Sequence, residues 1–234
     1  MFQSRSTAVP KEAPSLIEKK DYVQPQNKNE NISLDFVVND NELIRYNGAG
    51  GSIVIPTGVK TIKDKAFKNN KNITNIKLSE VQIIGNYAFD GCENLRAVTF
   101  DNVIVIGNSA FEDCCVLDDV KLPKSLRKIG NSAFEGCVGL RKASILKGCT
   151  SIGNSAFEKC RNLESIKMPD SVTEIGGSAF RKCSVLRRIF LHKGIISLGD
   201  SIFDDCVDLT IEYQRIGQNW NNDWNCGCNI QEVK

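Results

Sequence analysis

Histidine is almost absent from this chain. Among 234 residues only His192 is a histidine, so any Ser-His-Asp triad or Cys-His pair would have to use it. It directly follows a predicted strand, where we expect a solvent-facing edge residue. The acidic residues lie scattered over predicted turns and form no repeated acid–base pair. The sequence therefore predicts a protein that is not an enzyme and that needs no cofactor.

The chain also lacks a charge excess and a long apolar run. Its 30 Lys+Arg and 28 Asp+Glu leave a net charge of +2, whereas nucleic-acid-binding proteins usually carry a marked basic excess. No run approaches the roughly 18 apolar residues that span a membrane. The opening residues, 1–5, lack the apolar core of a secretory signal. We expect a monomer that binds no nucleic acid, does not insert into a membrane, and either stays inside the cell or has lost a leader.

What the chain does contain is a regular repeat, marked by phenylalanines at steps of 22 or 23 residues: Phe67, Phe89, Phe111, Phe134, Phe157, Phe180 and Phe203. A fixed period of this length is typical of a solenoid, in which each unit packs only on its neighbours. Each repeat is expected to contain a strand, a turn, a shorter extended piece, a Gly corner after an Ile, and a helical turn near Ala156–Cys160. Seven coils at about 4.8 Å each would span roughly 35 Å.

Six of the ten cysteines recur three residues after a repeat phenylalanine: Cys92, Cys114, Cys137, Cys160, Cys183 and Cys206. Equivalent side chains of a stacked array point into the same core, where free Cys behaves as a small hydrophobe. We therefore expect a column of buried thiols. Cys115, Cys149, Cys226 and Cys228 fall outside that column and are the better disulfide candidates. Cys226 and Cys228 lack the second ligand pair of a structural zinc site, so no bound metal is predicted.

Three segments follow from the composition. Residues 1–33 are polar and contain three prolines, which predicts a flexible tail. Residues 34–230 form the solenoid, with an N-terminal cap over 34–61 and an irregular C-terminal cap over 210–230. Alternation around a polar break in Leu34–Tyr46 predicts a hairpin within the first cap. Trp220 and Trp224 are expected to pack in the second.

The repeats resemble BspA-type leucine-rich repeats, whose pattern is Leu-x-x-Ile-x-Leu-Pro followed by Ile-Gly-x-x-Ala-Phe-x-x-Cys. The copy from Leu163 to Gly176 matches this pattern nearly throughout. The resemblance implies an α/β fold, a right-handed β-α leucine-rich-repeat solenoid with about seven coils. It also implies a binding role, often that of a surface-exposed or secreted adhesin of bacteria or protist parasites, and no shared catalytic residues.

A candidate binding surface follows from the strand pattern. Side chains alternate between the two faces of a strand, so the residues that flank each core position must point away from the core. In leucine-rich-repeat folds this exposed surface is the concave one. The predicted partner-binding residues are Asn75, Lys77, Thr99, Asp119, Lys121, Lys142, Ser144, Ser165, Lys167, Arg188 and Phe190.

The excess of cations on this surface leaves two interpretations open. Lysines also keep an exposed sheet soluble and unpaired. Alternatively they dock an acidic protein or glycan, with Phe190 as an apolar anchor. We predict a non-enzymatic recognition or adhesion protein at the cell surface or outside the cell. The alternative is a cytoplasmic scaffold for protein–protein interaction.

Overall fold

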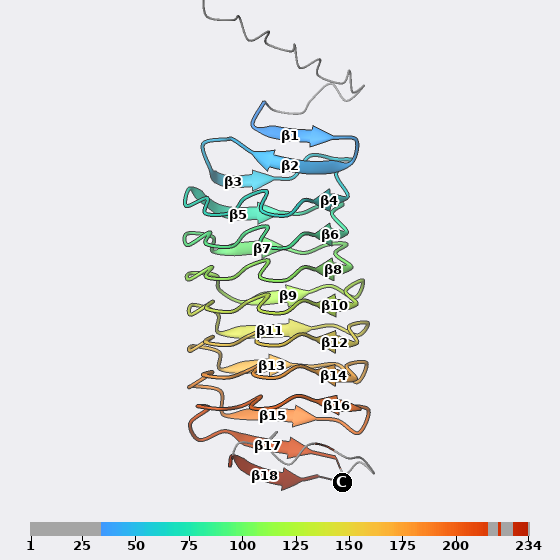
Figure 1. Cartoon of the computed structure of the whole chain (residues 1–234), viewed down its shortest axis with the longest axis vertical. Coiled ribbons are helices and arrows are strands. Elements are labelled where there is room, and N and C mark those ends of the chain that lie inside the picture. The colour runs from blue at the N-terminus through green and yellow to red at the C-terminus, as the bar shows by residue number, and fades with distance from the viewer. Residues whose placement is uncertain (1–33, 215–219, 221–226, 234) are drawn as a thin grey trace, which may run out of the picture.

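The computed structural model of the chain describes residues 34–214, 220 and 227–233, which stack into a solenoid of about eight coils (Figure 1). In this view the coils follow one another along a nearly straight axis. The predicted tail of residues 1–33 lies outside the described residues. The repeat architecture predicted from the phenylalanine period is confirmed.

One side of the stack carries the longer strands. They form three parallel three-stranded sheets that lie one after another along the stack. The first contains β3 (Gly51–Val54), β5 (Ile73–Lys77) and β7 (Ala97–Thr99). The second contains β9 (Val120–Leu122), β11 (Lys142–Ile145) and β13 (Ser165–Lys167). The third contains β15 (Arg188–Leu191), β17 (Thr210–Tyr213) and β18 (Asn229–Glu232).

The other side carries one nine-stranded sheet, built mostly from two-residue strands at the Ile-Gly positions. It begins with the antiparallel hairpin β1 (Phe36–Asn39) and β2 (Glu42–Tyr46), and β2 then pairs in parallel with β4 (Thr61–Ile62). The predicted hairpin is thus confirmed. The sheet continues through β6 (Ile83–Ile84), β8 (Val105–Ile106), β10 (Lys128–Ile129), β12 (Ser151–Ile152), β14 (Glu174–Ile175) and β16 (Ser197–Leu198).

The helical turn that was expected around each phenylalanine does not form, and no helix occurs among the described residues. Each coil instead has left-handed residues two positions before and two positions after its phenylalanine. Around Phe134 these are Ser132 (φ 52°) and Gly136 (φ 71°). A left-handed residue interrupts the right-handed backbone that a helix needs. The segment is therefore a series of turns, and the fold is a β-solenoid rather than a β-α solenoid.

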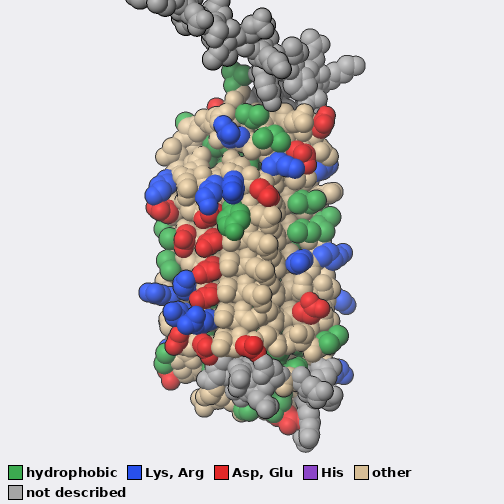
Figure 2. Space-filling model, in the orientation of Figure 1, with side chains coloured by type: hydrophobic (Ala, Val, Ile, Leu, Met, Phe, Trp, Pro, Cys, Tyr) green, Lys and Arg blue, Asp and Glu red, His purple; other side chains and the backbone are tan. Residues whose placement is uncertain are grey.

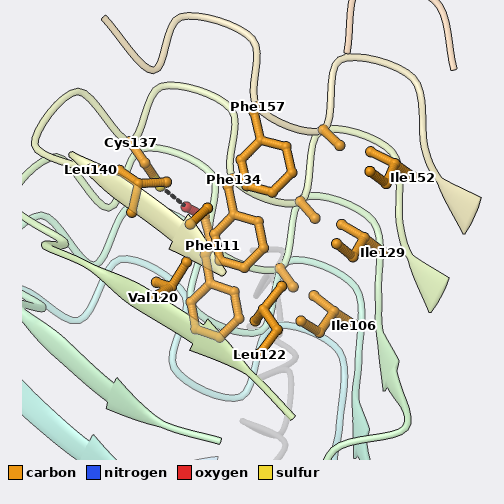
Figure 3. Packing of buried hydrophobic residues seen from close by; sticks show 14 of the residues in the cluster. Ile106, Phe111, Val120, Leu122, Ile129, Phe134, Cys137, Leu140, Ile152 and Phe157 are labelled. Carbon is orange, nitrogen blue, oxygen red and sulfur yellow. Dashed lines mark hydrogen bonds between the residues drawn. The ribbon is translucent and has the colours of Figure 1, made fainter. Parts of the chain in front are cut away.

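The repeat phenylalanines form a continuous stack through the core (Figure 3). From Phe67 to Phe203 successive ring centroids lie 4.7–5.8 Å apart with interplanar angles of 4–15°. All seven rings are at most 2% exposed. Each stacked pair contributes on the order of 1 kcal/mol beyond its buried area. Every repeat therefore adds a similar stacking energy to the stability of the solenoid.

The predicted column of buried thiols is confirmed. Each of the six repeat cysteines donates its S–H to the carbonyl of a phenylalanine in the preceding coil. Cys137 Sγ lies 3.1 Å from the carbonyl oxygen of Phe111, as Figure 3 shows, and the six distances run from 3.1 to 3.3 Å. Burial raises the pKa of the five thiols from Cys92 to Cys183, that of Cys92 to about 12. These side chains are therefore neutral hydrogen-bond donors at physiological pH.

The proposed disulfide candidates are corrected by the structure. Cys115, Cys149 and Cys228 are free thiols, and Cys226 lies outside the described residues. Cys228 belongs to the thiol column after all, because its Sγ lies 4.0 Å from the carbonyl oxygen of Phe203. The 22-residue step from Cys206 to Cys228 was a signal of this. It was missed because no phenylalanine stands three residues before Cys228.

A ladder of asparagines joins the coils on the outside, at the position after each Ile-Gly. Asn86 Oδ1 accepts the backbone N–H of Asn108 at 2.8 Å, and Asn108 Oδ1 accepts that of Asn131 at 2.9 Å. Asn131 and Asn154 continue the series, which ends at the N–H of Gly177. Sequence reasoning did not identify this ladder, because each bond joins residues 22 or 23 positions apart.

The Gly of each Ile-Gly pair serves a purpose other than the tight corner that was expected. A Cβ built on Gly130 would lie 2.5 Å from the carbonyl carbon of Gly107 and 2.7 Å from the backbone nitrogen of Asn108. Neither Gly130 nor Gly107 has a positive φ. Glycine is therefore needed here because adjacent coils approach too closely for any side chain.

Candidate functional site: the strand face

The candidate site is the outer surface of the longer strands, which we call the strand face. The central residue of each strand points inward: Val120, Ala143 and Ile189 are 3%, 1% and 2% exposed. The residues on either side of it point outward, as side-chain alternation requires. The strand face therefore consists of two columns, A before the core residue and B after it.

Strand pairing fixes the order within each of the three sheets, and the order of the coils along the chain joins the sheets into two columns. Column A contains Ser52, Asn75, Ala97, Asp119, Lys142, Ser165, Arg188 and Thr210. Column B contains Val54, Lys77, Thr99, Lys121, Ser144, Lys167, Phe190 and Glu212. The structure thus brings all eleven residues predicted from the sequence onto one surface, and each is exposed or half-exposed.

Four strand-face lysines have no acidic partner within the part of the chain that the structure describes. Lys77, Lys121, Lys142 and Lys167 are exposed and form no ion pair there. Arg188 differs, because its guanidinium lies 3.4 Å from the carboxylate of Glu212. The surface therefore presents four cations that form no ion pair with the described residues, although Lys142 is close enough to help lower the pKa of Asp118.

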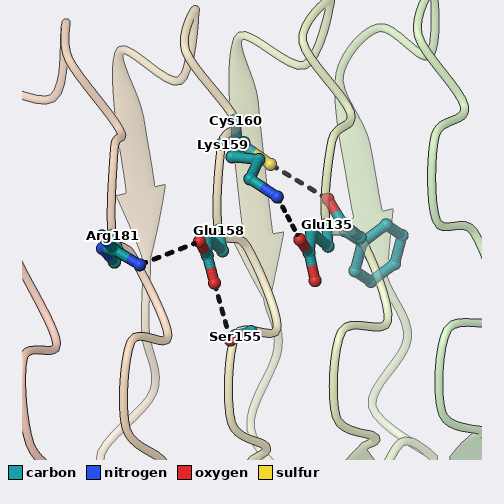
Figure 4. Close-up of polar contacts among 7 residues, drawn as sticks. Glu135, Ser155, Glu158, Lys159, Cys160 and Arg181 are labelled. Carbon is teal, nitrogen blue, oxygen red and sulfur yellow. Dashed lines mark hydrogen bonds and ion pairs between the residues drawn. The ribbon is translucent and has the colours of Figure 1, made fainter.

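A row of acidic side chains elsewhere on the solenoid shows the opposite behaviour. Asp90, Glu112, Glu135 and Glu158 each follow a repeat phenylalanine, and Figure 2 shows acidic side chains in a row along the stack. Lys68 pairs with Asp90. Lys159 Nζ lies 2.7 Å from Glu135, and Arg181 lies 3.6 Å from Glu158 (Figure 4). Most of this row is thus neutralised internally.

Glu112 is the member of that row without an ion pair among the described residues. Burial raises the pKa of its carboxyl group, and the neighbouring carboxylates of Glu135, Asp90 and Asp113 raise it further. The pKa of Asp113 is also raised, first by burial and then by its acidic neighbours. A hydrogen bond from Ser109 to Glu112 and the charge of Lys159 near Asp113 offset these increases in part. The described residues contain no group of three or more metal-ligating side chains arranged to hold an ion.

The C-terminal end of the strand face, Thr210 and Glu212, was missed because the last repeat is one residue short, and its N-terminal end, Ser52 and Val54, was not predicted either. Thr210 pairs with Arg188 and Glu212 with Phe190, so the face continues past the last predicted position. Phe190 is 39% exposed beside Glu212. At the other end, Val54 is 59% exposed next to Lys77. Column B therefore has one exposed apolar residue in its first coil, Val54, and one next to its last residue, Phe190.

His192 is not the solvent-facing residue that was expected. It is only 4% exposed, and its Nδ1 accepts the backbone N–H of Gly194 at 3.0 Å. Its Nε2 is buried and has no hydrogen-bond partner among the described residues. It occupies the position of Pro123 and Pro169 in other repeats, so it turns inward with the backbone there. His192 is therefore a buried residue of the turn after β15 whose imidazole accepts a backbone hydrogen bond.

The C-terminal cap is described only in part. Trp220 packs against Tyr213 with ring centroids 6.3 Å apart and is partly buried against the core. Its predicted packing role is thus observed, whereas Trp224 lies outside the described residues. None of the described segments is a helix long and apolar enough to cross a membrane.

These features define the class of the molecule: a β-solenoid repeat protein with a free strand face and no recognisable catalytic centre in its described part. The family follows from the repeats themselves. Residues 46–161 and 104–230 match the BspA type leucine rich repeat region. The chain belongs to this family.

Solved structures extend the likeness. A leucine rich cell surface protein from Faecalibacterium prausnitzii A2-165 is 31% identical with a TM-score of 0.68, over 76% of this chain and 52% of that one. The T. pallidum leucine rich repeat protein is 28% identical with a TM-score of 0.56, over 77% and 75%. A leucine-rich repeat protein from Bacteroides ovatus, 24% identical with a TM-score of 0.53, shares the fold over 85% of this chain and 67% of its own. The chain spans about half the length of the F. prausnitzii protein. None of the curated proteins matches it.

Proposed function

We propose that this protein is a non-enzymatic recognition protein that binds an extended acidic partner, protein or glycan, across its strand face. The observation that carries the proposal is a set of four exposed lysines that form no ion pair among the described residues, Lys77, Lys121, Lys142 and Lys167. Complementary charge steers encounter and fixes register. The acidic row supports the proposal, because most of its carboxylates are paired with cations of neighbouring coils, whereas the strand-face lysines are not.

We place the protein at the cell surface or outside the cell. The F. prausnitzii relative is described as a cell surface protein, which supports this location. A second candidate is an intracellular scaffold that uses the same face. The nine described cysteines are all free, and persistent free thiols are typical of a reducing compartment. Fractionation of the native cells, with an antibody to the solenoid, separates the two locations.

The binding proposal is tested with charge reversal. Wild-type protein and the Lys121→Glu/Lys167→Glu variant are passed over an immobilised panel of acidic peptides and acidic glycans. The matched control is Lys124→Glu/Lys128→Glu, which changes the net charge equally at two exposed lysines outside the strand-face columns that form no ion pair among the described residues. We expect the strand-face variant to lose binding and the control to keep it. Equal binding by all three proteins would place the site elsewhere.

A further inference from the structure

The cations of the strand face alternate between its two columns over four consecutive coils. Lys121 is in column B, Lys142 in column A, Lys167 in column B and Arg188 in column A. The hydrogen-bonded register fixes this order for the first three, because Ser144 pairs with both Lys121 and Lys167 while Lys142 pairs with Ser165. Each of these coils therefore offers one cation, on alternate sides of the axis.

The position opposite each cation is occupied by a neutral residue in three of the four coils. Ser144 accompanies Lys142, Ser165 accompanies Lys167, and Phe190 accompanies Arg188. The fourth, Asp119, accompanies Lys121. Serine hydroxyls can donate and accept hydrogen bonds, and an exposed aromatic ring offers a flat apolar face. These are the side chains that bind sugar hydroxyls and the apolar faces of sugar rings.

The spacing of the cations distinguishes between a peptide and a glycan. Paired strands lie about 4.8 Å apart, so Lys121 and Lys167, which are two strands apart in the sheet of β9, β11 and β13, recur on the same side at about 10 Å. An extended peptide advances about 3.3 Å per residue, and its same-side residues recur at about 6.6 Å. An acidic peptide strand along the axis would therefore lose register within two coils. A pyranose is longer than a peptide residue, and in a chain of equatorial β-1,4 links successive rings turn over, which places their carboxylates on alternate sides.

We infer that the strand face binds a linear β-1,4-linked polyuronate along the solenoid axis, one carboxylate per coil, from Lys121 to Arg188. This inference rests on the proposed function and names its ligand class. In the bound state Lys121, Lys142 and Lys167 pair with successive carboxylates. Arg188, already held by Glu212, contributes less. Phe190 packs on the sugar ring at that end.

The probe is a purified β-1,4-glucuronan oligosaccharide series, with cello-oligosaccharides as the neutral glycan control and poly-glutamate as the acidic peptide control. Calorimetry should show affinity rising up to about four sugars, the number of coils that carry cations, and then levelling off. Neutral cello-oligosaccharides should not compete. Single Lys→Gln changes at 121, 142 or 167 should each weaken binding about two- to fivefold, as expected for exposed ion pairs.

The decisive variant keeps the net charge of the strand face and changes only the alternation of its cations between columns A and B. Lys142→Ser with Ser144→Lys moves one cation from column A to column B in the same strand. We expect this double variant to lose about as much glucuronan affinity as Lys142→Gln, with an unchanged unfolding midpoint. Wild-type affinity in the double variant would overturn the inference, and so would tighter binding of poly-glutamate than of glucuronan. If poly-glutamate bound more tightly than glucuronan, the proposed function would still stand, because the strand face would bind an acidic partner. If neither polyanion bound, and the acidic panel gave no difference between the strand-face and control variants, both would fail.

Discussion

Replacing Gly130 by alanine tests the close approach of the coils. A Cβ at this position would lie 2.5 Å from the carbonyl carbon and 2.6 Å from the carbonyl oxygen of Gly107. Favourable contacts between carbon atoms lie at about 3.5–4.0 Å, so the two coils must separate by about 1 Å at this point. The N–H of Gly130 donates to the carbonyl of Ile106 at 2.9 Å, and separation of the coils would lengthen that bond.

Two opposing effects decide whether Gly130→Ala raises or lowers the free energy of unfolding. Overpacking of this kind costs about 1–3 kcal/mol. Replacing glycine by alanine also restricts the unfolded chain and stabilises the protein by about 0.4–1 kcal/mol where the native φ suits alanine. Gly130 has no positive φ, so both effects apply. The contact is the larger, and we expect a net loss of about 1–2 kcal/mol in the free energy of unfolding.

The assay is urea unfolding followed by circular dichroism, with Gly51 as the matched control. Gly51 has a φ of 78°, and nothing lies near its Cβ position, so there the backbone conformation requires glycine and contact does not. Asparagine tolerates the left-handed region. Gly51→Asn should therefore cost less than Gly51→Ala, whereas Gly130→Asn should cost more than Gly130→Ala. A Gly130→Ala variant more stable than the wild type would refute the close-contact argument.

Two further predictions concern the thiols and the acidic row. A thiol reagent at pH 8 should modify Cys115, which is partly exposed, well before Cys92, whose pKa is raised by burial to about 12. Peptide mapping of the native protein measures the labelling rate of each cysteine. Equal rates for the two residues would contradict the buried thiol column. Glu112→Gln should stabilise the protein at pH 7, because a carboxyl pKa raised by burial means that ionisation opposes folding. The gain should vanish below about pH 4, where the wild-type carboxyl group is already protonated. Urea midpoints of both proteins at the two pH values test this, and a gain that persists in acid would count against it.

Much of the fold could be predicted from the sequence because its signals are local or strictly periodic. The phenylalanine steps predicted the stack, and the cysteine steps predicted the thiol column. Period-two alternation predicted which side of each strand faces solvent, and all eleven predicted strand-face residues lie there. These inferences succeeded because equivalent residues of a solenoid occupy equivalent environments.

Other features depended on contacts between coils. The expected helical turn failed because Ser132 and its equivalents adopt positive φ, a choice that the sequence of one repeat does not reveal. The inward turn of His192 was also not evident from spacing, whereas the entry of Cys228 into the thiol column could have been inferred from its 22-residue step after Cys206.

The amino-acid sequence by itself determined the repeat, the core columns and the cation-rich face, since each is a property of one repeat copied along the chain. Only the tertiary structure decided which charges remain available. Lys159 Nζ lies 2.7 Å from Glu135 of the preceding coil, whereas Lys121 forms no ion pair in the described part of the chain. Ion pairing depends on distances between side chains from different coils, and these distances exist only after the coils have stacked.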